Sequence, residues 1–191
     1  MNPPAKLKFA HSVALAVAQE IVNALSLSCE RIIIAGSLRR EKQWVGDIEI
    51  LYISKVVTGF KPGDMFAQET RFLAEDHLAS LLASKALTMR INSAGIQTWG
   101  DKNKLAVHAA SGIPVDLFST TEECWFNSLI CRTGSAATNI SIATRAQKVG
   151  WKWNPYGPGF ITIAGDDCRQ VTSEEDLFDF LKMPCLEPKD R

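Results

Sequence analysis

The stretch at residues 36–49, which reads G-S-L-R-R-E-K-Q-W-V-G-D-I-E, decides how the chain around it folds. An apolar run at residues 31–35 precedes it, and a second apolar run at residues 48–53 begins before it ends. Short β-branched runs bounded by turn residues are typical of buried strands. This part of the sequence therefore predicts a strand, a tight turn, a connection and a second strand.

The polar residues of the turn suit a polyphosphate. Gly36 has no side chain, so an anionic group can approach the backbone closely, and Ser37 adds a hydroxyl to the local amide donors. Arg39 and Arg40 contribute two permanent cations with fork-shaped donors that match phosphate oxygens. The turn is therefore a candidate cradle for a nucleoside triphosphate.

Two acids follow at strand spacing. Asp47 and Glu49 are two residues apart, so their side chains emerge on the same face of a strand. Two like charges held this close are costly unless a cation neutralises them, and Mg²⁺ commonly takes one or two carboxylates together with substrate phosphates. The acid pair alone also fits a solvated turn with a salt-bridged edge, and it is the combination with the glycine-serine and arginine pairs that favours a metal site.

The combined pattern resembles the nucleotidyltransferase superfamily and, within it, the family X DNA polymerases, whose G-S-x-R-R … G-D-x-[DE] signature it matches at this spacing. A third acid, Asp116, lies in the apolar strand predicted at residues 115–118, where a charge is expensive unless it is paired. The resemblance implies that Asp47, Glu49 and Asp116 are the catalytic acids and hold two Mg²⁺ ions, with Mn²⁺ able to substitute. It also implies that Asp116 helps to remove the proton of a primer 3′-hydroxyl.

The C-terminal half resembles the same family. The matching landmarks are T-G-S at residues 133–135, Asn139, Gly150, S-E-E-D-L-F-D-F at residues 173–180 and the terminal E-P-K-D-R. The resemblance covers about residues 10–191 and is greatest to the minimal, two-part members known from viruses and prophages. It implies nucleotide contacts from Gly36, Ser37, Arg39, Arg40, Arg132, Thr133, Gly134 and Asn139.

The chain departs from the family pattern at three places. The pair at residues 131–132, Cys and Arg, stands where many members carry two aromatic residues beside the sugar. Pro114 replaces an arginine that often neighbours the third carboxylate, and Ala143 replaces one that often contacts the templating strand. These departures concern sugar selection, support of Asp116 and template reading, respectively.

The order of the predicted elements favours an α+β fold. We expect a nucleotidyltransferase palm at residues 1–120, a mixed sheet with helices on one face, and a small α+β subdomain at residues 121–191 that binds the nascent base pair. Amphipathic spacing predicts a helix at residues 10–27 and a helix of about five turns that begins near Phe66, after a break at residues 61–64. Further strands are predicted at residues 87–91, 96–99 and 105–109. An aromatic turn is predicted at residues 151–157, between a helix from Ala136 and a last helix at residues 176–182.

Composition limits the partners and the compartment. The formal net charge is +0, so DNA binding must rely on local patches, for which the candidates are Lys102, Lys104, Arg145 and Lys148. Five cysteines without a C-x-x-C pair argue against a disulfide framework or a zinc site and favour the cytoplasm of a bacterium or of a cell infected by a virus or phage. No apolar run approaches the length of a membrane span, so we expect no membrane partner, and we expect a monomer.

Three hypotheses about function remain open at this point. The first is a Mg²⁺-dependent DNA polymerase of the family X type, which transfers a nucleoside monophosphate from a (d)NTP to a primer 3′-hydroxyl in gapped or primed DNA, in gap filling or repair. The second is a nucleotidyltransferase that works without a template on RNA, a protein or a small molecule. The third is a catalytically silent module that binds DNA ends, which the presence of all three carboxylates disfavours.

Overall fold

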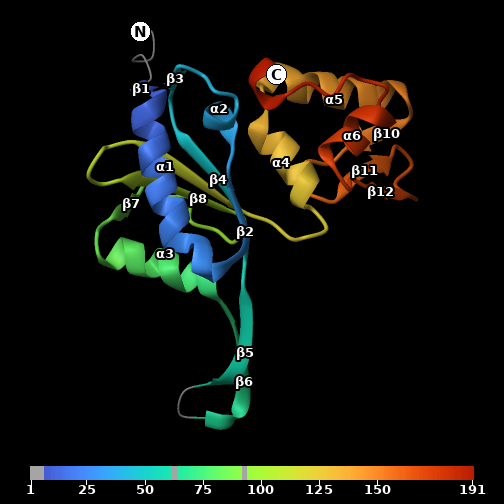
Figure 1. Cartoon of the computed structure of the whole chain (residues 1–191). Helices are drawn as coiled ribbons and strands as arrows, with labels where there is room; N and C mark the ends of the chain where they lie inside the picture. Colours follow the sequence, from blue (N-terminus) through green and yellow to red (C-terminus); the bar gives the residue numbers. More distant parts are fainter. Residues whose placement is uncertain (1–6, 62–63, 92–93) are drawn as a thin grey trace.

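The computed structural model describes residues 7–61, 64–91 and 94–191, and it is an α+β protein (Figure 1). Its centre is a five-stranded mixed sheet in the order β2-β4-β9-β8-β7. The strands are β2 (Cys29–Ile34), β4 (Ile48–Ser54), β9 (Pro114–Ser119), β8 (Asn103–His108) and β7 (Leu87–Met89). The two central strands, β4 and β9, are parallel, and the other neighbours in the sheet are antiparallel.

Two helices, α1 (His11–Leu25) and α3 (Leu73–Ala83), cover one face of this sheet (Figure 1). The apolar residues of α1 recur at helical spacing and form one stripe, which is why this segment becomes a helix that buries a single face. The buried residues are those of the predicted stripe: Ala14, Val17, Ala18, Ile21 and Leu25. The 3₁₀ turn η1 (Ser26–Ser28) ends α1, and β1 (Phe9–Ala10) pairs with β3 (Trp44–Val45).

The opposite face of the sheet carries the acids. Side chains alternate along a strand, so Ile48 and Ile50 of β4 pack against α1 and α3, while Glu49 and Leu51 point to the other side. On that side the helix α4 (Trp125–Thr133) packs with Trp125 and Leu129 against Leu51 and Phe118. The apolar contact thus lies beside the acids and on the same face.

The C-terminal part has a core of its own, formed around α5 (Ala136–Lys148) and α6 (Glu174–Phe180). A small antiparallel sheet joins them, with β10 (Trp151–Trp153), β11 (Gly159–Thr162) and β12 (Cys168–Gln170), and the chain ends in η2 (Pro188–Asp190). Trp153 is buried and donates its indole N–H to Asn127 Oδ1 at 2.6 Å, and Trp151 meets the ring of Phe180 edge-on. These two tryptophans therefore pack inside the C-terminal core.

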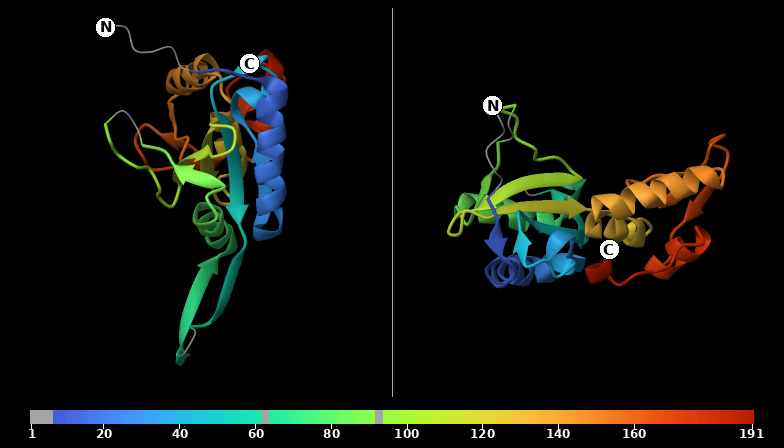
Figure 2. Two further views of the ribbon diagram at one scale, coloured as in Figure 1. Left: turned by 90° about the vertical axis from the view of Figure 1, so that its left-hand side faces the viewer. Right: turned by 90° about the horizontal axis from the view of Figure 1, so that it is seen from above.

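The prediction of a helix starting near Phe66 is wrong for its first two turns. The chain instead forms a hairpin of β5 (Val56–Lys61) and β6 (Asp64–Phe72), which projects away from the rest of the protein (Figure 1, Figure 2). Phe66 and Thr70 fit both the helical spacing and the period of two that a strand requires, and the cross-strand partner of Thr70 is the β-branched Thr58. Within the predicted break, Pro62 and Gly63 lie outside the described residues.

Smaller differences concern the connections. The predicted tight turn at Gly36 is a short helix, α2 (Gly36–Arg39). Residues 96–99 make isolated bridges rather than a strand, and the predicted aromatic turn begins with the strand β10. Helix α4, whose stripe the sequence did not reveal, follows β9 after a short linker, so the boundary predicted between residues 120 and 121 falls in that linker and stays a prediction.

Candidate active site

Two of the three predicted catalytic acids lie directly opposite each other on the central strands. Glu49 of β4 and Asp116 of β9 are cross-strand partners in the parallel pair, and adjacent strands are about 4.8 Å apart. Asp47 immediately precedes β4 and lies close enough to Glu49 to raise the pKa of its carboxyl. The fold therefore gathers the three acids in one small area, on the sheet face that α4 also contacts.

The electrostatics of this area are unfavourable for negative charge. Burial, together with the neighbouring Asp47 and Asp116, raises the pKa of the Glu49 carboxyl to about 7, against the opposing effects of Arg132 and Arg40. All four neighbours are therefore within electrostatic reach of Glu49. A divalent cation would relieve this repulsion.

Two of the acids make close contacts of their own in the structure. Glu49 lies against Gly36, where a Cβ would come within 2.0 Å of Oε2, while Asp116 Oδ1 lies 2.8 Å from Arg90 Nη2. Accordingly, no three His, Cys, Asp or Glu side chains of the described residues are clustered as ready metal ligands. Since the donors are all hard carboxylate oxygens on one face, the residues fit Mg²⁺ chemically.

The segment at residues 36–40, called the arginine turn below, offers unsatisfied donors beside these acids. Gly36 has a φ of +62°, a backbone conformation that favours glycine, and it places α2 next to β4. Ser37 Oγ and Arg40 Nε are buried and have no hydrogen-bond partner within the described parts of the chain. Buried polar atoms are normally paired, so these two atoms fit a site for an anionic ligand such as a triphosphate.

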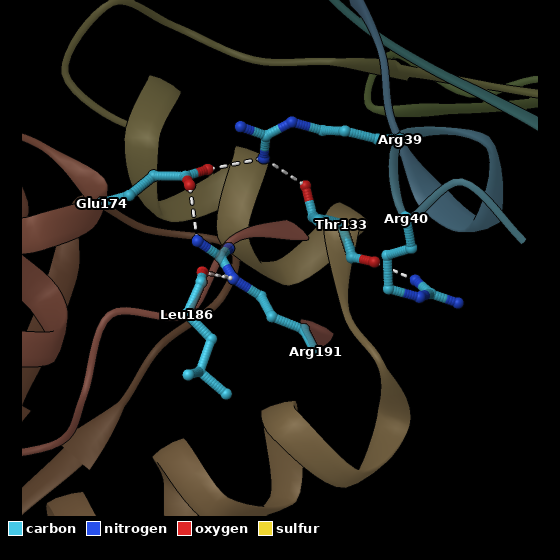
Figure 3. A network of polar contacts seen from close by, with 6 residues as sticks. All are labelled: Arg39, Arg40, Thr133, Glu174, Leu186 and Arg191. Carbon is cyan, nitrogen blue, oxygen red and sulfur yellow. Dashed lines mark hydrogen bonds and ion pairs between the residues drawn. The ribbon is translucent and has the colours of Figure 1, made fainter. Parts of the chain in front are cut away.

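A polar network joins this turn to the C-terminal part (Figure 3). Arg39 Nη1 donates to Thr133 Oγ1 at 2.7 Å and to Glu174 Oε1 at 2.6 Å, and Arg40 Nη1 donates to the Thr133 carbonyl. Arg191 Nη2 donates to Glu174 Oε2 at 2.7 Å. The sequence places Glu174 only in the landmark at residues 173–180 and does not indicate this role, because nothing local points to a partner on α2.

The other predicted nucleotide contacts lie at the end of α4 and the start of α5. The guanidinium of Arg132 lies 3.6 Å from the centroid of the Phe118 ring, on the acid-bearing face of β9. Gly134 packs against Arg40, since a Cβ there would lie 3.2 Å from Nη1. Asn139 donates to the carbonyl of Cys131 at 2.9 Å, so in this structure its amide ties α5 to α4.

The structure changes the set of candidate DNA contacts. Lys104 is buried and pairs with Glu75 at 2.8 Å on the opposite face of the sheet, which removes it from the candidates. Lys102 is exposed and lines a pocket between the sheet and α4 that Arg132 also lines. Lys148 is exposed on α5, and Arg145 donates Nε to the Leu181 carbonyl at 2.9 Å.

The fold defines an α+β protein in which an acid-bearing sheet lies beside a C-terminal part with a separate core. Residues 128–191 match the family model described as the DNA polymerase beta thumb. The match supports a relationship with the polymerase-beta-like, family X proteins, and the sheet that carries the acids lies outside it. None of the described helices combines the length and the apolar character needed to cross a lipid bilayer.

Proposed function

We propose that this protein is a Mg²⁺-dependent nucleotidyltransferase of the DNA polymerase beta type, which adds nucleoside monophosphates to a primer 3′-hydroxyl. The observation that carries the proposal is the placement of Glu49 opposite Asp116, on the face that also receives the arginine turn and α4. The thumb match of residues 128–191 supports DNA as the substrate. Gap filling or repair is the corresponding proposed role.

Three acids are proposed to hold the metal. Asp47, Glu49 and Asp116 would together hold two Mg²⁺ ions. When bound, the ions supply charge neutralisation at the triphosphate and make the primer hydroxyl more acidic. The raised pKa of Glu49 fits this role, because a carboxyl that is costly to ionise in the free protein gains most from a cation.

The protein's own residues then position the reaction. Asp116 accepts the proton of the primer 3′-hydroxyl, whose oxygen attacks the α-phosphorus of the (d)NTP. The bond from that phosphorus to its bridging oxygen breaks, and pyrophosphate leaves. Ser37 and Arg40 bind the departing phosphates through Ser37 Oγ and Arg40 Nε, donors that have no hydrogen-bond partner among the described residues.

DNA is proposed to bind along the exposed cations on either side of the acids. Lys102 lies directly before β8 and Lys148 is the last residue of α5, and both are exposed, so both can meet phosphates without reading sequence. Arg132, Thr133 and Gly134 are proposed to contact the sugar of the incoming nucleotide, and Asn139 its base edge. An arginine in this position replaces an aromatic contact with a charged one, so acceptance of both deoxy and ribo sugars is part of the proposal.

The test is a primer-extension assay with a labelled primer, alone or annealed to a gapped template. Each dNTP or NTP is supplied with Mg²⁺ or Mn²⁺, and the Asp47→Asn and Asp116→Asn variants are run in parallel. Templated products that disappear in both variants support the proposal. Untemplated addition indicates a terminal transferase instead. Activity that persists in both variants, or metal-independent DNA binding without turnover, contradicts it.

A further inference from the structure

A single row of residues crosses the sheet at the level of the acids. Glu49 of β4 is opposite Asp116 of β9, and Asp116 is opposite Leu105 of β8. Arg90, directly after β7, continues the row by donating its amide to the Leu105 carbonyl at 2.9 Å. Residues that are directly opposite in a ladder point to the same face, so Arg90 emerges on the side of Glu49 and Asp116.

The side chain of Arg90 reaches across β8 to the third acid. Its Nη2 lies 2.8 Å from Asp116 Oδ1, and the two side chains retain 25% and 16% of their exposure. The contact is an ion pair rather than an aligned hydrogen bond, because Oδ1 meets no hydrogen-bond geometry there. The positive charge of Arg90 and the length of its side chain therefore contribute more to this contact than the planar geometry of the guanidinium.

The other cations around the acids are directed elsewhere. Arg39 pairs with Glu174, Arg40 donates to the Thr133 carbonyl, and Arg132 stacks on Phe118. Next to Asp116 on its own strand and face stands Pro114, which has neither charge nor N–H. The support of Asp116 therefore comes from another strand of the sheet, a relationship that the sequence does not reveal.

We propose that Arg90 is a positioning residue for Asp116, and this rests on the proposed function. Arg90 holds Oδ1 at 2.8 Å and so restrains the rotamer of Asp116, the acid proposed to bind the metal and to accept the proton. Because it is a cation beside the acids, it also opposes metal binding at the same position. Arg90 thus restrains the affinity of the acids for cations and at the same time orients the acid that accepts the proton.

These two effects make a pair of measurements diagnostic. In Arg90→Gln, we expect Mn²⁺ to bind at least about threefold more tightly in a titration followed by electron paramagnetic resonance, because a nearby positive charge is lost. The single-turnover rate of primer extension should fall about tenfold to a hundredfold with little change in the KM for dNTP, because misorientation costs mainly the chemical step. Arg90→Lys should recover a substantial part of both.

The control is Arg71→Gln, which removes the same charge from an exposed ion pair with Asp76 at 2.6 Å and should leave both quantities unchanged. A simultaneous fall in the metal affinity, the rate and the melting temperature of Arg90→Gln would show a structural role and overturn the proposal. So would unchanged values in Arg90→Gln.

If the wild-type protein transfers no nucleotide to any substrate, the metal titration still decides the matter. The effect of Arg90→Gln on Mn²⁺ affinity should then shrink in an Asp116→Asn background, because the proposed coupling runs through that carboxylate. An undiminished effect in that background would refute the positioning role, independently of the reaction.

Discussion

Gly36 and Glu49 are packed so closely that a Cβ on the glycine would lie 2.0 Å from Glu49 Oε2 and 3.1 Å from Glu49 Cβ. The glycine also has a φ of +62°, where any other residue is strained. The arginine turn and the acid strand therefore contact each other through a position that only glycine fits.

Replacing this glycine should damage the site more than the fold. In Gly36→Ala we expect nucleotidyl transfer to fall about a hundredfold, because the added Cβ displaces Glu49 from its position opposite Asp116. The free energy of unfolding should fall by only about 1–2 kcal/mol, the cost of the left-handed conformation. Extension rates and thermal denaturation measure the two effects.

A matched glycine provides the control. Gly112 has a φ of +71° and nothing within 4 Å of an added Cβ. Gly112→Ala should therefore show the conformational cost without the loss of activity. Equal activities in the two variants would mean that the close approach at Gly36 has no functional role.

The pH dependence of stability should carry the signature of Glu49. Its pKa is raised to about 7 by burial and by the neighbouring acids, so the folded protein binds more protons than the unfolded chain between about pH 4.5 and pH 7. The stability due to the protonated carboxyl is present below pH 4.5 and is lost as the pH rises through 7. The loss is about 3 kcal/mol for the metal-free protein.

Denaturant titrations of the wild type and Glu49→Gln across this pH range isolate the contribution. The difference in free energy of unfolding between the two proteins should change with pH in the stated direction, and saturating Mg²⁺ should reduce the change. A difference that stays constant from pH 4.5 to pH 8 would show that Glu49 has an ordinary pKa.

The bridge between Arg39 and Glu174 should couple the arginine turn to the C-terminal part. Both side chains are largely buried, with exposures of 21% and 13%, and the contact is 2.6 Å. A double-mutant cycle with Arg39→Ala, Glu174→Ala and the double variant should give a coupling energy of about 1–3 kcal/mol in thermal or chemical denaturation. Additive effects would indicate that Arg191 alone satisfies Glu174.

The projecting hairpin should be dispensable for folding. The described residues of β5 and β6 contribute nothing to the three apolar cores, and the hairpin leaves the sheet where Leu73 donates to the Lys55 carbonyl. Replacement of residues 58–70 by an Asn-Gly turn should keep the free energy of unfolding within about 1 kcal/mol. Leu117→Ala, which empties a fully buried site on β9, should cost about 2–5 kcal/mol. Equal losses in the two variants would show that the hairpin supports the fold.

The sequence predicts those features that depend on local patterns. The stripe of α1 needs only the period of a helix, and the structure has it. The spacing of Asp47 and Glu49 is likewise a local pattern, and Asp47 directly precedes the strand that carries Glu49. Phe66 was misassigned because its neighbours satisfy two periods at once, and only pairing with β5 decides between them. Local patterns are thus sufficient where one period dominates.

Contacts made across several strands were not predictable in this way. Arg90 meets Asp116 through the register of two ladders, and the same register places Lys104 on the opposite face, where it pairs with Glu75 of α3. Glu174 likewise meets Arg39 only once the two parts of the chain are placed side by side. Each of these depends on the tertiary arrangement, which a spacing rule does not contain.

The parallel pairing of β4 with β9 also has a consequence for how the chain acquires its structure. Parallel neighbours cannot be joined by a short turn, so everything between Ser54 and Pro114 must be looped out before the two strands meet. Such long-range closure is slow compared with the formation of helices or hairpins. In a refolding experiment, the helical circular dichroism signal should therefore return first. The ability to bind a divalent ion should return only when β4 and β9 have paired.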